Sequence, residues 1–158
     1  QHLLRFFQKI SRSNKGRNKM CTTKIRVRYS DVDRMGVVHH AVYPLWYEMA
    51  REDFMERLYM TPTELEKKKN IVLPLIHLHA HYFAPVYPQD VLEMEVHLKR
   101  VTETRTEFAY ELYKENRILC HKGETVHAWA DTETFRTINI FQKYPDIYQI
   151  FQEKCEVE

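Results

Sequence analysis

The residues best able to do chemistry in this chain are concentrated between Tyr29 and Tyr43. This segment holds two aspartates, one glycine and two histidines, and it ends where a helical pattern begins. A carboxylate can attack a carbonyl carbon or take a proton from water. The first N–H groups of a helix have no partner within the helix and can stabilise an oxyanion that develops on a substrate. The segment therefore indicates chemistry on an ester-type carbonyl.

Asp33 is the candidate for the reactive carboxylate. Asp31 and Asp33 both lie where the strand alternation gives way to a turn, and Gly36 permits a tight chain path there. The N–H groups around His40 and Ala41 are the candidate oxyanion donors. The alternative is that both aspartates only cap the turn, as aspartate commonly does. The residue types alone favour that alternative.

The strand and the helix on either side of this segment follow from the hydrophobic pattern. Ile25, Val27 and Tyr29 alternate with basic residues, which predicts a half-buried strand. Residues 41–59 are predicted to form a long helix, because their apolar residues step by three or four and form one stripe. The stripe consists of Val42, Leu45, Trp46, Met49, Ala50, Phe54 and Leu58.

The remaining elements begin with a short helix. Thr61 and Pro62 suit its start, and it is predicted to end near Asn70. After Asn70 the apolar residues recur with a period of two, which predicts antiparallel strands. The predicted strands span residues 71–83, 92–98, 106–113 and 118–131, with a hairpin turn at 115–117 and a terminal helix at 145–154. This order predicts one α+β domain in which an antiparallel sheet wraps around the long helix.

Composition and charge exclude several classes of protein. With 44% hydrophobic and 29% charged residues, the composition is that of a globular domain. No apolar run approaches the roughly 18–20 residues that a membrane span needs. Only three glycines are present and no GxGxxG motif, which argues against a phosphate-binding loop. Residues 20–158 hold 18 Lys/Arg against 22 Asp/Glu, and this net negative charge argues against a nucleic-acid-binding core.

Residues 1–19 are interpreted as a basic N-terminal extension to a single domain at 20–158. They contain six Lys/Arg and no acidic residue. The alternatives are an organelle-targeting peptide or a membrane-surface helix. Three cysteines without CxxC spacing, Cys21, Cys120 and Cys155, indicate reduced thiols and hence a cytoplasmic protein.

His77, His79 and His81 are expected on one face of a predicted strand. As metal ligands they would need a fourth partner in convergent geometry, and the sequence has no motif that supplies it. Solvent-facing or dimer-interface histidines are the favoured interpretation. No metal and no organic cofactor is predicted.

The segment from Tyr29 to Tyr43 resembles the 4-hydroxybenzoyl-CoA thioesterase family, and most closely its YbgC-like acyl-CoA thioesterases. These proteins carry Tyr-x-x-x-Asp-x-x-Gly-Val-Val-x-His-x-x-Tyr. Every fixed position of that pattern is met, at Tyr29, Asp33, Gly36, Val37, Val38, His40 and Tyr43. The resemblance continues in Tyr-Glu-Met-Ala-Arg-Glu at 47–52 and in Tyr-Phe-Ala-Pro-Val at 82–86 followed by Asp90. It covers roughly residues 22–135, within the usual error of such boundaries.

The resemblance implies the hotdog fold, in which a sheet wraps around a central helix and two protomers pair. It also implies that Asp33 is the catalytic carboxylate and that the backbone N–H of His40 polarises the thioester. Tyr29 and the His40 side chain match further active-site positions of the family. Asp31 is a candidate second carboxylate, which would orient the other residues of the site.

Four further residues are predicted to belong to the site. Val38, His39 and Tyr43, in the same segment, are predicted substrate-binding residues. Glu48 is an alternative to Asp33 for the role of catalytic carboxylate, since related hotdog thioesterases place this carboxylate on the central helix. With Asp33 present, Glu48 is predicted to be structural or auxiliary.

The predicted function is hydrolysis of an acyl-CoA thioester to a carboxylic acid and CoA. Asp33 either activates water or attacks first, and the sequence leaves both routes open. One alternative has an acyl carrier protein as the thiol carrier. The other is a non-catalytic hotdog module that binds acyl thioesters, which the presence of Asp33 disfavours. A homodimer or homotetramer is predicted, with no nucleic-acid partner and no transmembrane segment.

Overall fold

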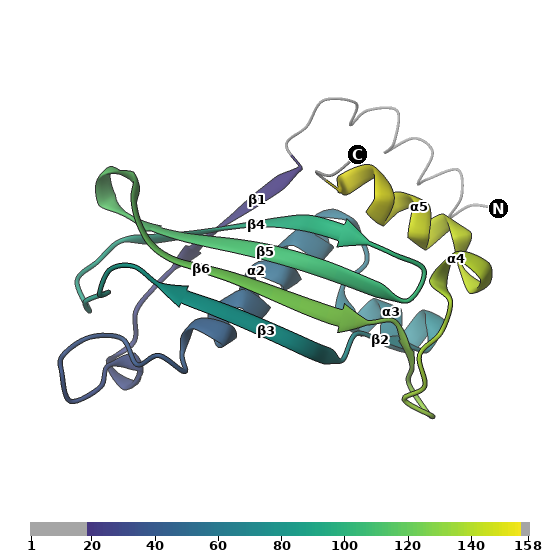
Figure 1. Cartoon of the computed structure of the whole chain (residues 1–158), viewed down its shortest axis with the longest axis horizontal. Helices are drawn as coiled ribbons and strands as arrows, with labels where there is room; N and C mark the ends of the chain where they lie inside the picture. The colour runs from purple at the N-terminus through teal and green to yellow at the C-terminus, as the bar shows by residue number, and fades with distance from the viewer. Residues whose placement is uncertain (1–18, 156–158) are drawn as a thin grey trace.

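The sheet of this protein is built from strands in which apolar residues alternate with polar ones. A computed structural model describes residues 19–155, so most of the predicted N-terminal extension lies outside the described residues (Figure 1). Five strands form one antiparallel sheet in the spatial order β1-β4-β5-β6-β3. They are β1 (Met20–Ile25), β3 (Leu75–Tyr82), β4 (Leu92–Val101), β5 (Arg105–Lys114) and β6 (Ile118–Ala128). A separate ladder joins β2 (Ile71–Val72) to β7 (Ala130–Asp131).

One face of this sheet is apolar, and we call it the inner face. On β4, which lies beside the central strand β5, the side chains at alternate positions are fully buried: Leu92, Met94, Val96 and Leu98. The antiparallel register places Val96 opposite the buried Tyr110 of β5. Burying one side chain of this size is worth about 1.5–3 kcal/mol. The outer face carries ion pairs such as Lys99–Glu124 at 2.7 Å, so the core lies on one side of the sheet.

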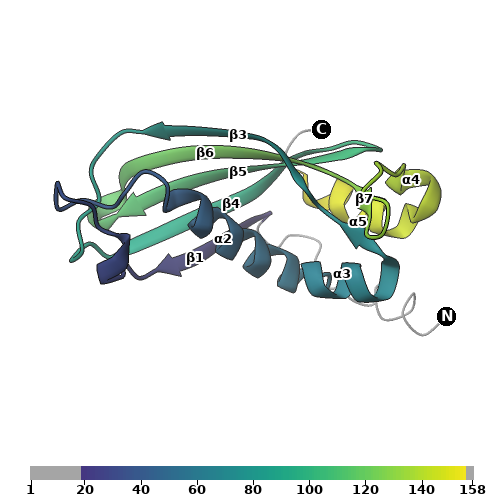
Figure 2. The same ribbon diagram turned by 90° about the horizontal axis from the view of Figure 1, so that it is seen from below.

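Helix α2 (Tyr43–Arg57) lies along the inner face, and no helix covers the outer face in the part of the chain that is described (Figure 2). Its buried side chains are Tyr43, Trp46, Tyr47, Ala50, Phe54 and Met55. The predicted apolar stripe is wrong at two positions, because Leu45 and Met49 remain 52% and 46% exposed. They lie on a flank of the helix that turns away from the sheet, whereas Tyr47 and Met55 enter the core.

The strand before the aspartate-rich segment is shorter than predicted. It ends at Ile25, and a short 3-10 helix, η1 (Tyr29–Asp31), follows. The cause is the Asp31 carboxylate, whose Oδ2 accepts a hydrogen bond of 2.7 Å from the Arg28 N–H and closes a turn. The predicted strands at 71–83 and 118–131 are each divided in two as well, into β2 and β3 and into β6 and β7.

The smaller helices follow their capping residues. Helix α3 (Pro62–Lys69) begins with a capping box, because Thr61 Oγ1 accepts from the Glu64 N–H at 3.2 Å and Glu64 accepts from the Thr61 N–H at 3.1 Å. The predicted terminal helix is confirmed as α5 (Pro145–Lys154), and a short helix, α4 (Ile140–Lys143), precedes it without having been predicted. The predicted turn between β5 and β6 is confirmed as η2 (Glu115–Arg117).

The two edges of the sheet differ. Beyond β1, Cys155 continues along the same side of β4 through a bridge to Leu98. At the opposite edge, β3 pairs with β6 alone among the strands of residues 19–155, and its large apolar residues are exposed: Leu75, Ile76, Leu78 and Tyr82. Among the helices of residues 19–155, none is long and apolar enough to cross a membrane.

The close approach of α2 to the sheet depends on Gly123. A Cβ atom placed on this β6 residue would overlap with the hydroxyl and ring carbons of Tyr47. We predict that Gly123→Ala lowers the free energy of unfolding by about 1–3 kcal/mol, the usual cost of overpacking a core. Urea unfolding would measure the loss. The neighbouring outer-face change Lys122→Ala is the control and should cost less than about 0.5 kcal/mol; equal losses would contradict the packing explanation.

Candidate active site

A tight turn holds Asp33 between η1 and α2. The Asp33 N–H donates to the Val37 carbonyl at 2.9 Å, and the Gly36 N–H donates to the Asp33 carbonyl at 3.1 Å. Gly36 has a φ of +78°, a left-handed conformation that suits glycine. The Val38 N–H then donates to the Val86 carbonyl at 2.9 Å, which attaches the turn to the segment after β3. The predicted turn is therefore closed by its own hydrogen bonds and attached to the segment between β3 and β4.

Asp33 lines a cavity, and its carboxylate is oriented by one hydrogen bond. Its Oδ1 accepts a hydrogen bond of 2.8 Å from the Met35 N–H, which fixes the orientation of the group. Its Oδ2 makes no hydrogen bond or ion pair with any other residue of 19–155. The cavity has a volume of about 290 Å³ and is lined by Asp33, Met35, Val37, Val38, His40, Tyr43, Tyr82, Phe83, Ala84 and Pro85.

The turn that starts α2 leaves one N–H unused. The Val42 N–H donates to the His39 carbonyl at 3.0 Å, and the Ala41 N–H donates to His39 Nδ1 at 3.0 Å. For the N–H of His40, no acceptor is present within residues 19–155. The carbonyl of His40 accepts a hydrogen bond of 2.6 Å from the Tyr82 hydroxyl. Asp33 and His40 therefore line the same cavity, and each has one polar atom, Oδ2 of Asp33 and the backbone N–H of His40, without a partner among residues 19–155.

The other predicted residues of the segment have different surroundings. Val38 and Tyr43 line the cavity and are otherwise buried, whereas His39 is exposed and stacks on His40 at 4.1 Å between ring centroids. Tyr29 is 99% exposed and does not line this cavity. Asp31 is 3% exposed, with both oxygens facing Arg28. The roles of Tyr29 and Asp31 in the site stay predictions.

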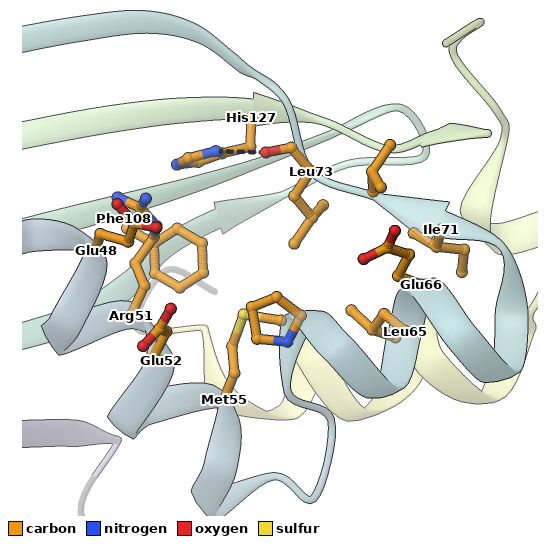
Figure 3. A pocket seen from close by; sticks show the side chains of 12 residues that line it. Glu48, Arg51, Glu52, Met55, Leu65, Glu66, Ile71, Leu73, Phe108 and His127 are labelled. Carbon is orange, nitrogen blue, oxygen red and sulfur yellow. Dashed lines mark hydrogen bonds between the residues drawn. The ribbon is translucent and has the colours of Figure 1, made fainter. Parts of the chain in front are cut away.

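Glu48 belongs to a second cavity, of about 190 Å³, between α2, α3, β2 and the inner face of β5 and β6 (Figure 3). Glu48, Arg51 and Glu52 face it from α2, and Leu65 and Glu66 face it from α3. Its remaining lining is mostly apolar and includes Met55, Ile71, Leu73 and Phe108, together with the buried His127. The structure thus separates Glu48 from Asp33 within one chain.

A directed chain of hydrogen bonds runs behind this second cavity. Arg51 Nη1 donates to the Tyr110 hydroxyl at 3.0 Å, and that hydroxyl lies 2.7 Å from Thr125 Oγ1. His127 Nε2 lies 3.0 Å from the same Oγ1, and its Nδ1 lies 3.0 Å from the Leu73 carbonyl. Because a carbonyl can only accept, Nδ1 carries a hydrogen, and because burial lowers the pKa of His127 to about 4, the ring is neutral at pH 7 and Nε2 accepts. The network therefore fits a neutral imidazole, and Arg51 serves it as the first donor.

A second buried imidazole, His121, lies behind the wall of the Asp33 cavity. Its Nε2 is hydrogen-bonded to the Tyr47 hydroxyl, and its Nδ1 has no partner within residues 19–155. Its ring packs at 4.4 Å from Tyr43 and 4.6 Å from Tyr82, measured between centroids. Burial lowers the pKa of His121 to about 4 and raises the pKa of Tyr43 to about 12. This aromatic cluster is therefore uncharged at neutral pH.

The sequence patterns did not identify His121 and His127 as part of any site. A signal was present, because both fall on the inward-facing positions of β6, in register with buried residues of β5. His77, His79 and His81 are exposed on β3. Within residues 19–155 no group of three or more His, Cys, Asp or Glu side chains could hold a metal ion.

These features define a hotdog-fold protein, in which an antiparallel sheet wraps one long helix and a carboxylate lies beside the start of that helix. The chain belongs to the Thioesterase-like superfamily, whose pattern matches residues 27–154. The predicted fold and family are confirmed.

Several relatives support this placement. YneP of Bacillus subtilis is 25% identical over 130 residues, which span 82% of this chain and 94% of the relative. The acyl-CoA thioester hydrolase YbgC of Shigella flexneri is 25% identical over 107 residues, or 68% of this chain and 79% of that protein. The crystal structure of DHNA-CoA thioesterase from Staphylococcus aureus matches with a TM-score of 0.80 and 25% identity, over 85% of this chain and 89% of that one. The predicted class of enzyme, a thioester hydrolase, agrees with these relatives.

The two buried histidines predict how stability depends on pH. Burial lowers the pKa of both His121 and His127 from 6.5 to about 4, so the unfolded chain binds their protons first as the pH falls. Stability is therefore full above pH 6.5 and is lost between 6.5 and 4, by up to about 1.4 kcal/mol per pH unit for each imidazole. Urea unfolding from pH 7 to pH 5, where most carboxylates stay ionised, would measure this slope. His127→Gln should remove about half of it, and a flat profile in the parent protein would contradict the assignment.

Proposed function

We propose that this protein hydrolyses acyl-CoA thioesters, with Asp33 as the reacting carboxylate. The observation that carries the proposal is that one cavity is lined by both Asp33 and His40, whose Oδ2 and backbone N–H have no partner among residues 19–155. A thioester needs a nucleophile or a base on its carbonyl carbon and a donor at its carbonyl oxygen. The names of YbgC and of the Staphylococcus aureus thioesterase support the same chemistry.

Two routes use the same groups. In the first, Asp33 takes a proton from water as the water oxygen attacks the thioester carbon, and the His40 N–H stabilises the oxyanion. Collapse of the tetrahedral intermediate expels the CoA thiolate, which recovers the proton. In the second, Asp33 Oδ2 attacks the carbon and expels the thiolate, and water then hydrolyses the resulting mixed anhydride. In both routes the products are a carboxylic acid and free CoA, and no cofactor takes part.

The rival functions differ in what the cavity accepts or lacks. An acyl carrier protein could present the same thioester, so this alternative concerns only the thiol carrier. A non-catalytic module would need the cavity but not the free carboxylate. The Met35 N–H binds only Oδ1 of Asp33, so Oδ2 of this cavity-lining residue is left without a partner among residues 19–155, which supports catalysis over mere binding.

We further propose that the protein is at least a homodimer and that it acts in the cytoplasm. An edge strand with exposed apolar residues is a ready template for pairing with another chain, and β3 has this character along its length. The exposed flank of α2, with Leu45 and Met49, offers further apolar surface. A cytoplasmic location is supported by the three cysteines, which are all free and buried.

We predict that Asp33→Asn nearly abolishes thioester hydrolysis without unfolding the protein. Asparagine keeps the shape of the side chain but is neither a base nor a nucleophile, and such groups typically contribute ~10²–10⁴-fold. Thiol release from acetyl-, hexanoyl-, palmitoyl- and benzoyl-CoA would measure the loss and identify the preferred acyl group. Asp146→Asn at the start of α5 is the control for a lost charge and should retain full activity. Near-normal turnover by folded Asp33→Asn would transfer the assignment to another carboxylate.

The proposed dimer is tested by two substitutions of the same residue type. Ile76 on β3 and Ile118 on β6 are 47% and 45% exposed. We predict that Ile76→Asp shifts the mass measured by light scattering toward the 19.2 kDa monomer, because it places a charge on the pairing edge, whereas Ile118→Asp leaves the mass unchanged. A parent protein that is fully active as a monomer would overturn the proposal.

A further inference from the structure

Tyr82 connects the sheet to the turn that carries the proposed oxyanion donor. It is the last residue of β3, and its hydroxyl donates to the His40 carbonyl at 2.6 Å, across 42 positions of sequence. Its ring lines the Asp33 cavity and packs edge-on against Tyr43 at 5.0 Å and His121 at 4.6 Å. The ring is thus held by aromatic neighbours, and the hydroxyl has a fixed direction.

The hydrogen bonds of this turn explain why the Tyr82 contact matters for the N–H of His40. The peptide group between His40 and Ala41 is held at both ends, because its oxygen accepts from Tyr82 and its N–H donates to His39 Nδ1. The preceding peptide group is held at its oxygen by the Val42 N–H. The only other polar group of this peptide is the N–H of His40. These contacts fix the plane of the peptide and therefore set the direction of this N–H.

Of these contacts, the Tyr82 contact alone comes from another element of the described structure. The other two lie within residues 39–42 and would move with the turn. Asp33 is held by its own turn, and the residues just before His40 are attached as well, because the Val38 N–H donates to the Val86 carbonyl at 2.9 Å and the His39 N–H donates to the Asp31 carbonyl at 2.8 Å. On the other side of the His40 N–H, Tyr82 holds the His40 carbonyl to β3, so the spacing between the carboxylate of Asp33 and this N–H depends in part on Tyr82.

We infer that Tyr82 is a positioning residue, which fixes the His40 turn so that the His40 N–H faces the substrate carbonyl above Asp33. The inference rests on the proposed thioester hydrolysis and adds to it the residue that aligns the oxyanion donor. Burial raises the pKa of the Tyr82 hydroxyl, so it stays protonated and able to donate at neutral pH. A preorganised donor matters because a misaligned donor stabilises the transition state less, which lowers kcat while substrate binding is little changed.

The first test removes the hydroxyl and keeps the ring. Tyr82→Phe should lower kcat by about 10- to 100-fold, somewhat less than loss of an oxyanion donor itself, and should change KM by less than about twofold. The matched control is Tyr87→Phe, since Tyr87 lies a few residues further along the chain and does not line the cavity. An unchanged kcat in Tyr82→Phe would overturn the inference, and so would a loss confined to KM.

A second test reads the turn without any substrate. In Tyr82→Phe, amide hydrogen exchange at Ala41 and Val42 should accelerate by at least about tenfold, because their turn is released from the sheet. Exchange at Gly36 and Val38, in the Asp33 turn, should stay the same. Unchanged exchange at Ala41 and Val42 would overturn the positioning role whether or not the protein hydrolyses thioesters.

A third test reads the donor on a bound thioester. The probe is the most rapidly hydrolysed acyl-CoA of the panel, labelled with ¹³C at the carbonyl and bound to the slow Asp33→Asn variant. The carbonyl stretch should lie at lower frequency there than with Asp33→Asn/Tyr82→Phe, since polarisation by the His40 N–H weakens the C=O bond. Equal frequencies would overturn the inference. If the parent protein hydrolyses no member of the panel, the proposed function fails, and the amide exchange alone decides the role of Tyr82.

Discussion

The burial of α2 against the inner face of the sheet is the constraint on which the site depends. Tyr47 lies over Gly123, where any side chain on the strand would overlap with it, and its hydroxyl reaches His121. This contact sets how closely the helix approaches β6. Because α2 is rigid, the same contact places the start of the helix at the end of the sheet where β3 finishes. Core packing therefore places the start of α2, and the Tyr82 contact and the turns of the segment orient the N–H of His40 there.

The core beside the site is unusual in holding imidazoles where an apolar residue would be expected. Burying a polar group costs free energy unless it is hydrogen-bonded. His127 meets this requirement through Thr125 and Leu73, and His121 meets it in part through Tyr47. The hydrogen bonds of each imidazole also orient the groups that bind it, which a leucine side chain could not do. The directed network explains why Arg51 can extend into a half-buried position without a carboxylate partner among the described residues.

Most of the fold could be predicted from the sequence, because hydrophobic periodicity indicates which residues share a face. It predicted the sheet, the long helix and the bounds of the terminal helix, and it located Asp33 and Gly36 in a turn. Periodicity does not state what covers a face, so Leu45 and Met49 were assigned to the core and are exposed. Tyr82 was out of reach for a related reason. Its contact with His40 joins residues far apart in sequence, and neither residue type predicts this contact.

The proposed dimer would bring the two cavities of different protomers close to each other. An isologous pairing of β3 with a second copy about a two-fold axis runs the strands antiparallel. The Tyr82 end of one strand then lies beside the Leu75 end of the other. The Asp33 cavity borders the Tyr82 end, whereas the cavity that contains Glu48 borders Leu73, just before the Leu75 end. Pairing would therefore bring the Asp33 cavity of one protomer next to the Glu48 cavity of its partner, so that residues separated within one chain adjoin across the axis. Glu48 could then act as an auxiliary group on the neighbouring site, although within its own chain it lies in a different cavity from Asp33.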